Sequence, residues 1–141
     1  MRYLCLVLAA SAGVAPAVAQ EQEQEEASAD ILYWVDGNWK IVGEDGIDIQ
    51  TCQKAQTFSL SKDRANIVLT EQWADFAATY RIVRIEEDRV LTMIEGEERT
   101  TEQGDPVLWW LHFRNRDNFS FRQYGWDRNS VTMAQWVRCP A

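Results

Sequence analysis

Hydrophobic and polar residues alternate over short stretches of this chain, and long stretches with helical periodicity are nearly absent. Alternation with a period of two is typical of a β-strand that buries one face. Gly, Asp and Asn residues separate the stretches, as tight turns between strands require. The pattern predicts short strands over residues 38–42, 52–60, 66–70, 79–86, 89–95, 98–103, 106–114, 119–126 and 131–139.

The stretch 106–114 carries the clearest alternation. Its odd-numbered positions form an unbroken apolar face, made of Val107, Trp109, Leu111 and Phe113. A slip of one residue would bury Arg114 without a partner, which costs more than the apolar area gained. We therefore expect the odd-numbered face to lie inside the protein. Trp110 then points outward and is open to solvent, with His112 and Arg114 beside it.

One segment departs from the strand pattern. Trp73, Phe76, Ala77 and Tyr80 are spaced as on one face of a helix. A short helix within residues 70–80 is therefore an alternative to a path of strand, loop and strand.

Seven or eight short antiparallel strands joined by tight turns indicate a meander. A flat meander of this length leaves two strand edges unpaired, and closing it into a barrel removes both. We predict an all-β fold, a small antiparallel up-and-down barrel of seven to eight strands with one disulfide. A β-sandwich is the alternative.

The first 30 residues differ from the rest of the chain. Residues 1–19 combine a basic start, an apolar run and a small-x-small site at Ala17-Val18-Ala19, which predicts a secretory signal peptide rather than a membrane span. Residues 20–30 are rich in Gln and Glu and cannot form a core, so we expect a disordered acidic linker. Residues 31–141 are expected to form a single domain, secreted or periplasmic after cleavage.

The cysteines fit an exported protein. Cys5 lies within the predicted signal peptide, and Cys52 and Cys139 remain after cleavage. An even pair in an oxidising compartment predicts one disulfide. It would close a loop of about 88 residues, for which the chain-entropy model gives about 4.6 kcal/mol. A metal site is not predicted, because two cysteines and one histidine supply too few ligands.

Charge narrows the range of partners. The whole chain has a net charge of −8, and residues 31–141 hold 13 basic and 17 acidic residues. No basic stripe outweighs the acids, which argues against a nucleic-acid partner. Within the domain, residues 86–105 carry a net charge of −6 and residues 106–141 a net charge of +3. The two segments either complement each other across hairpins or leave a basic aromatic patch that recognises an anionic group, made of Trp110, Arg114, Arg122, Tyr124 and Trp126.

Candidate catalytic groups are sparse. His112 is the only histidine, and no Ser or Cys stands in a nucleophile-elbow setting beside a base. Glu95 and Glu97 would share a strand face near Glu98, yet acids around a turn are usually solvated. We expect a protein that is not an enzyme and that needs no cofactor or metal.

The segment Gly37-Asn38-Trp39 stands at the start of the first predicted strand. It resembles the Gly-x-Trp signature of the lipocalin and calycin barrels. The resemblance implies that Trp39 closes the base of a barrel and that an arginine near the last strand packs over it. Arg138 is the first choice for that arginine, and Arg122 is the second. The family's Thr-Asp-Tyr-type triplet is not found in this chain.

Two functions follow from these features. The first is a barrel that binds a small apolar or amphipathic ligand. The alternative is a protein-binding module, such as an inhibitor of an envelope or secreted hydrolase, whose exposed aromatic side chains contact the partner. An open apolar cavity of about 300 Å³ or more would favour the first. A filled core with exposed aromatics would favour the second. His112, Arg114, Arg122, Tyr124, Trp126 and Trp110 are the predicted binding residues.

Overall fold

A computed structural model of the protein describes residues 31–43, 45–71, 73–126 and 135–141. The predicted signal peptide and acidic linker lie outside these residues. No helix in the described part of the chain is long and apolar enough to cross a bilayer.

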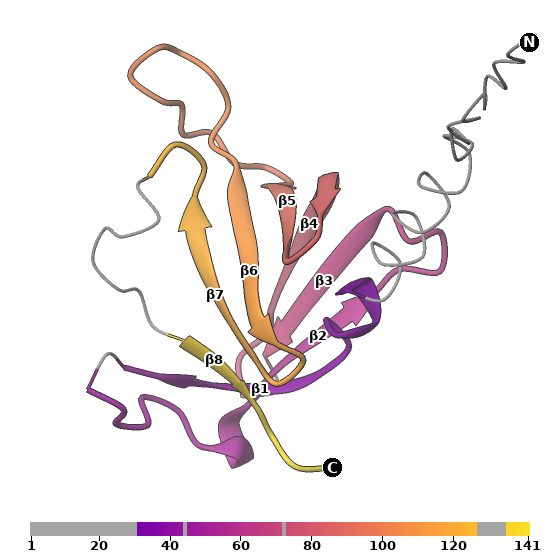
Figure 1. The fold of residues 1–141 in the computed structure, drawn as a ribbon, viewed down its shortest axis with the longest axis vertical. Helices are drawn as coiled ribbons and strands as arrows, with labels where there is room; N and C mark the ends of the chain where they lie inside the picture. Colours follow the sequence, from indigo (N-terminus) through magenta and orange to yellow (C-terminus); the bar gives the residue numbers. More distant parts are fainter. Residues whose placement is uncertain (1–30, 44, 72, 127–134) are drawn as a thin grey trace, which may run out of the picture.

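Eight antiparallel strands form a closed barrel in which each strand pairs with the next and β8 pairs with β1 (Figure 1). The all-β, up-and-down barrel predicted from the sequence is confirmed. The strands are β1 (Gly37–Val42), β2 (Gln56–Leu60), β3 (Asn66–Glu71), β4 (Phe76–Glu86), β5 (Arg89–Ile94), β6 (Trp109–Asn115), β7 (Asn118–Gln123) and β8 (Gln135–Arg138). A helical turn over residues 31–33 precedes β1.

Aromatic rings fill much of the interior. Trp39, Phe58 and Phe119 are wholly buried, and the ring of Phe119 contacts both of the others at centroid distances of 4.7 and 5.4 Å. Trp136 stacks on Phe119 at 5.6 Å. Each ring pair of this kind contributes about 0.5–1.5 kcal/mol beyond the area that it buries. The aromatic residues of the described core are Trp39, Phe58, Tyr80, Phe113, Phe119 and Phe121.

The register of β6 agrees with the prediction. Leu111 and Phe113 belong to the core, and Val107 just before the strand is also buried. His112 and Arg114 stay outside. The alternation alone fixes this choice, because shifting the pairing by one residue would exchange the two faces.

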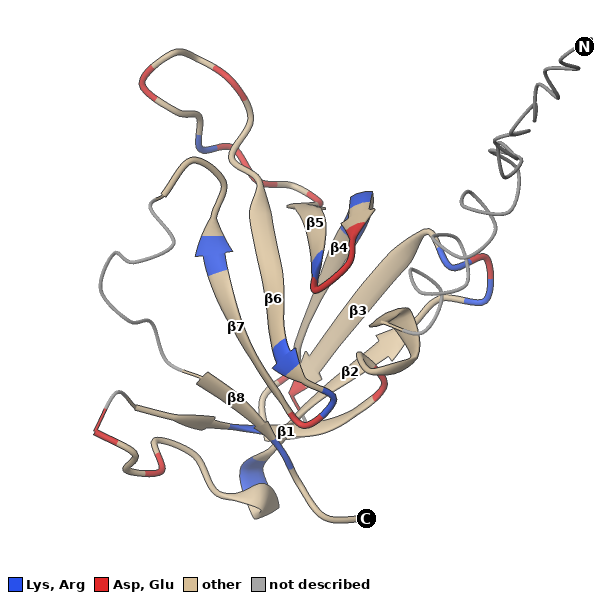
Figure 2. Ribbon diagram, viewed as in Figure 1, with Lys and Arg blue, Asp and Glu red and all other residues tan. Residues whose placement is uncertain are grey.

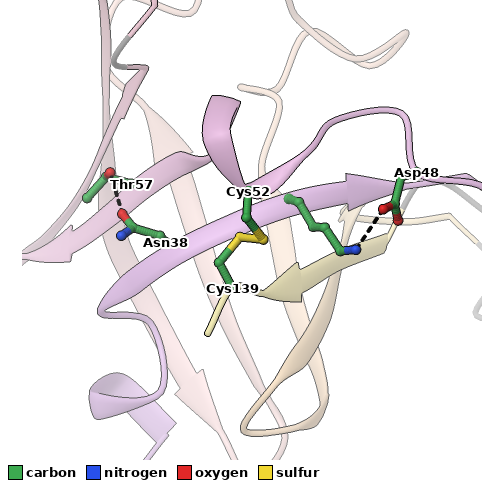
Figure 3. Close-up of a disulfide and its surroundings, with 6 residues drawn as sticks. Asn38, Asp48, Cys52, Thr57 and Cys139 are labelled. Carbon is green, nitrogen blue, oxygen red and sulfur yellow. Dashed lines mark hydrogen bonds and ion pairs between the residues drawn. A yellow bond between two sulfur atoms is a disulfide. The ribbon is translucent and has the colours of Figure 1, made fainter. Parts of the chain in front are cut away.

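The predicted disulfide is confirmed. Cys52 and Cys139 are bonded with their Cα atoms 5.6 Å apart (Figure 3). The bond ties the connection after β1 to the residue after β8. Nearby, Lys40 pairs with Asp48 and Thr57 donates to Asn38, each at 2.7–2.8 Å, so this side of the barrel is cross-linked by three kinds of contact.

The second predicted strand starts too early at Cys52. Residues Cys52–Lys54 form a 3-10 turn, η1, and β2 begins at Gln56. The alternation of Gln56, Phe58 and Leu60 is real, but it does not extend back to the cysteine. Cys52 instead turns toward Cys139.

The helix considered for residues 70–80 is wrong. β4 begins at Phe76 and pairs with β3 from Glu71↔Phe76 onward. Residues 73–75 form the turn between the two strands. Cross-strand pairing overrides the helical spacing here, since a helix would leave the ladder of β3 without its partner.

The other differences lie at strand ends. Residues 98–103, predicted as a strand, belong to a long connection that holds only the isolated bridge Thr100↔Pro106. β6 begins at Trp109 rather than at Pro106, and β7 ends at Gln123, where a turn through Gly125 takes over. Of the last predicted strand, residues 135–139 are described and β8 covers Gln135–Arg138; residues 131–134 lie outside the described part.

Candidate functional site

The two ends of the barrel are built differently. Because all neighbouring strands are antiparallel, the connections between them fall alternately at the two ends. We call one end the base; it holds residues 31–36, the turns 61–65, 87–88 and 116–117, and the C-terminal residues 139–141. We call the other end the mouth; its described residues are 43, 45–50, 73–75, 95–108 and 124–126, with Phe76 at its edge. Residues 51–55 are assigned to neither end, because Cys52 is bonded to Cys139 of the base. Long connections gather at the mouth and tight turns at the base.

The base is closed by Trp39 and Arg138. The Cζ atom of Arg138 lies 4.2 Å from the centroid of the Trp39 ring, and the Trp39 Nε1 donates to the Val35 carbonyl at 3.0 Å. Gly37 is required between them, because its φ is +145° and an added Cβ would lie 2.5 Å from Arg138 Nη1. Arg122, the second choice for the arginine, lines a groove on the outer wall instead.

Exposed apolar side chains gather at the mouth. Of the eight large hydrophobic residues that are exposed in the described part of the chain, six lie there: Ile47, Ile49, Trp73, Phe76, Tyr124 and Trp126. The other two are Tyr33 at the base and Val83 in the bulge of β4. Clusters of exposed apolar groups mark interaction surfaces more often than isolated ones do.

The mouth is also the acidic end. Its described residues include eight acids and one base: Asp45, Asp48, Asp75, Glu95, Glu97, Glu98, Glu102, Asp105 and Arg99. The described residues of the base include five acids and three bases. Figure 2 shows acidic positions along the 95–108 connection, which extends away from the sheet, with one basic position among them.

That one base is already paired. Arg99 donates to both carboxylate oxygens of Glu97, at 2.8 and 2.5 Å, and its guanidinium lies 5.8 Å from the ring centroid of Trp109. The side-chain hydrogen bonds from Arg99, helped by its backbone N–H, lower the pKa of Glu97 to about 2. The Glu97–Arg99 pair therefore holds the 95–108 connection against Trp109 at the start of β6. The other acids of this connection give it its negative charge.

A polar network lies just inside the mouth. Gln56 is buried, with its Nε2 donating to Glu71 Oε1 at 2.7 Å and its Oε1 accepting from Trp136 Nε1 at 2.7 Å. Two further polar atoms of this end, Trp109 Nε1 and Gln50 Oε1, are buried without a hydrogen-bond partner among the described residues. Buried polar atoms normally have partners, so an occupant or a water is expected near them.

The exposure predicted for Trp110 is wrong, although its direction is right. Trp110 points away from the core, opposite Leu91 and Arg122, yet only 7% of it is exposed. The guanidinium groups of Arg84 and Arg89 lie 5.4 and 4.1 Å from its ring centroid.

Glu86 holds both arginines over this ring. Its Oε1 lies 3.1 Å from Arg84 Nε, and its Oε2 pairs with Arg89. The bulge at Val83 brings Arg84 to the outer face opposite Leu91. Strand alternation predicts which way a side chain points, but it does not predict which charged side chains cover it.

Five of the six predicted binding residues lie over the outer face of β6 and β7, where Trp110 is the cross-strand partner of Arg122 and His112 is the partner of Ser120. His112, Arg114 and Arg122 line a groove of about 380 Å³ on the outer wall, together with Ser120 and Asp88. His112 Nε2 lies 2.7 Å from Asp88 Oδ2. Tyr124 contacts Trp110 at a centroid distance of 6.2 Å, and Trp126 contacts Trp109 at 6.3 Å. The predicted basic aromatic patch is therefore continuous on the outer wall from Arg114 through Arg122 and Trp110 to Tyr124, and only Trp126 stands apart from it, at the mouth.

Several residues of the mouth were not singled out as binding residues from the sequence. They are Ile47, Ile49, Trp73, Phe76 and Glu71. Each belongs to a connection or a strand end, and only the closed topology brings them to one end of the barrel. Among the described residues, no three His, Cys, Asp or Glu side chains are grouped as a metal site would need.

Comparisons with known proteins do not assign the chain to a family. No protein-family model, curated protein or solved structure matches the chain. We therefore infer function from the geometry of the barrel.

Proposed function

We propose that this protein is an exported binding protein that engages a partner protein through the mouth of its barrel. The observation that carries the proposal is the gathering of six exposed apolar side chains at one end. Exposed aromatics of this kind are the residue types that dominate protein interfaces. The aromatic filling of the core supports a protein partner over a ligand enclosed deep in the barrel.

Export is part of the proposal. It is supported by the apolar run and small-x-small site of residues 1–19, and by the bond between Cys52 and Cys139, which persists in oxidising compartments. The Gly37, Trp39 and Arg138 arrangement at the base supports a lipocalin-like origin for the barrel.

A small amphipathic ligand is the second candidate. The buried Trp109 Nε1 favours it, because a ligand with one hydrogen-bond acceptor could satisfy that donor at the mouth. Such a ligand would occupy the same end of the barrel as the proposed protein partner.

Photo-crosslinking distinguishes the mouth from the base. The photoreactive amino acid p-benzoylphenylalanine is placed at position 73, 126 or 33 in the protein expressed in its own host. Trp73, Trp126 and Tyr33 are all exposed, and Tyr33 is the matched control at the base. We expect positions 73 and 126 to capture the same protein and position 33 to capture none.

The captured partner is then purified and its affinity measured directly. Trp126→Ser should weaken binding about tenfold or more, as loss of an interface aromatic does, and Tyr33→Ser should leave it within about twofold. Crosslinking from position 33 alone, or equal losses in both variants, would contradict the proposal.

A further inference from the structure

We infer that the partner surface is basic as well as apolar, and that one of its lysine or arginine side chains enters the mouth and pairs with Glu71. This inference rests on the proposed function and adds the chemistry of the partner. It begins with the position of a single carboxylate.

Glu71 is the last residue of β3, and its side chain faces inward. Ile67 and Leu69 precede it at intervals of two and both are buried in the core. Alternation along a strand places Glu71 on the same face, at the mouth. Its hydrogen bond from the buried Gln56, 2.7 Å long, agrees with this direction.

The Glu71 carboxylate is held in a fixed position. Gln56 donates to it and is itself held by Trp136, whose ring packs on Phe121 at a centroid distance of 4.9 Å. A carboxylate oriented in this way loses little side-chain entropy when a ligand binds. It is a prepared acceptor for a charge-assisted hydrogen bond.

Glu71 lacks a cationic partner within the described part of the chain. The ion pairs found there join other acids, and Glu71 is bonded only to the neutral amide of Gln56. A carboxylate at the inner edge of an apolar rim is stabilised when a cation reaches it. Glu71 therefore favours an occupant that brings a positively charged group to the mouth.

An aromatic ring stands beside the carboxylate. Phe76 is the direct cross-strand partner of Glu71, and about half of it, 49%, is exposed. A basic side chain that approaches Glu71 would pass its aliphatic stem or its charged head over this ring. Both contacts are favourable, the second by about 0.5–2 kcal/mol.

The electrostatic field around Glu71 also favours a positively charged partner. The mouth carries a net charge of −7 over its described residues, and Glu98 and Glu102 on its long connection are exposed. This field draws a basic surface toward the mouth and repels an anionic membrane surface.

Two synthetic peptides test the inference: a 14-residue amphipathic peptide of leucine and lysine, and its analogue with glutamate in place of lysine. Affinities are measured by titration calorimetry at about 50 mM and 500 mM NaCl. Glu71→Gln keeps the shape and the hydrogen bond to Gln56 while removing the charge. Glu87→Gln removes one charge from an exposed position at the base.

We expect the lysine peptide to bind, the glutamate peptide to be at least tenfold weaker, and high salt to weaken the lysine peptide. Glu71→Gln should weaken the lysine peptide about fivefold or more, as loss of a partly buried charge partner does, and Glu87→Gln less than about twofold.

Each remaining outcome would overturn the inference. Failure of the lysine peptide to bind, or equal binding of both peptides, would show that the mouth does not select a basic partner. Equal losses in Glu71→Gln and Glu87→Gln show attraction by net charge alone. If Trp126→Ser weakens the peptide but Glu71→Gln does not, the apolar mouth stands and only the charge assignment falls. If neither variant weakens it, the proposed function falls as well.

Discussion

The guanidinium group of Arg138 lies over the indole ring of Trp39, with its Cζ atom 4.2 Å from the ring centroid. Its nitrogens also donate to the carbonyls of Asp36 at 2.7 Å and of Trp34. One side chain from the last strand thus fixes the residues before the first strand and covers the ring that closes the base.

Arg138→Met should lower the free energy of unfolding by about 2–4 kcal/mol. Methionine keeps an apolar stem over Trp39 but leaves the carbonyls of residues 34 and 36 without their charged donor. Urea denaturation followed by circular dichroism measures the loss. Arg114→Met, an exposed arginine on β6, is the control and should change stability by less than about 0.5 kcal/mol. Equal effects would show that Arg138 has no special role.

The closure of the barrel was predictable from the sequence because it follows from local patterns. Strand alternation, turn residues and one cysteine pair each indicate the same topology. The start of β2 was placed too early because the alternation that begins at Gln56 was extended back to Cys52. Cys52 lies instead in a 3-10 turn and is bonded to Cys139. The start of β4 was missed because the helical spacing of Trp73, Phe76 and Tyr80 competes with strand alternation there, and only the pairing of Phe76 with Glu71 shows that the strand begins at Phe76.

Removing the disulfide should destabilise the barrel. Cys52→Ser combined with Cys139→Ser is expected to lower the free energy of unfolding by about 2–5 kcal/mol, since the bond restricts the unfolded chain over a separation of 87 residues. Differential scanning calorimetry of the oxidised, reduced and doubly substituted proteins measures it. The reduced protein should melt with the doubly substituted one. A melting temperature that reduction leaves unchanged would contradict the expectation.

Trp110 should be shielded despite pointing outward. In protein labelled with 5-fluorotryptophan, we expect a soluble gadolinium chelate to broaden the ¹⁹F signal of Trp110 much less than that of Trp126, which is 47% exposed. Trp110→Phe assigns the signal. Arg89→Ala should increase the broadening because Arg89 lies closest to the ring, and Arg114→Ala should not. Strong broadening of Trp110 in the unsubstituted protein would disprove the arginine cover.

Glu97 should titrate far below an ordinary glutamate. Hydrogen bonds from Arg99 lower its pKa from 4.5 to about 2, so the stabilisation from this pair is complete above pH 4.5 and is lost as the pH falls toward 2. Carboxylate ¹³C NMR measures the midpoint. Arg99→Ala should raise the midpoint toward 4.5, whereas Arg81→Ala should leave it near 2. An ordinary midpoint in the unsubstituted protein would show that the pair does not form in solution.

The candidate site was harder to predict than the fold. Trp110, His112 and Arg114 stood out because they share one strand, and the sequence shows neighbours along a strand directly. Glu71, Trp73 and Phe76 lie at the hairpin between β3 and β4, whereas Trp126 follows β7, so their common location at one end of the barrel appears only when the barrel closes. Coverage of Trp110 by arginines from β4 and β5 was missed for the same reason.

Native mass spectrometry of the protein purified under mild conditions from its own host tests the central claim most directly. The claim is that the mouth engages a polypeptide rather than that the barrel encloses a small molecule. We predict a complex whose mass exceeds that of the barrel by a second polypeptide, together with free barrel that carries no small-molecule adduct. Trp126→Ser should shift the population from complex to free barrel, and Tyr33→Ser should not. A stoichiometric small-molecule adduct that survives both substitutions, with no polypeptide complex, would contradict the account.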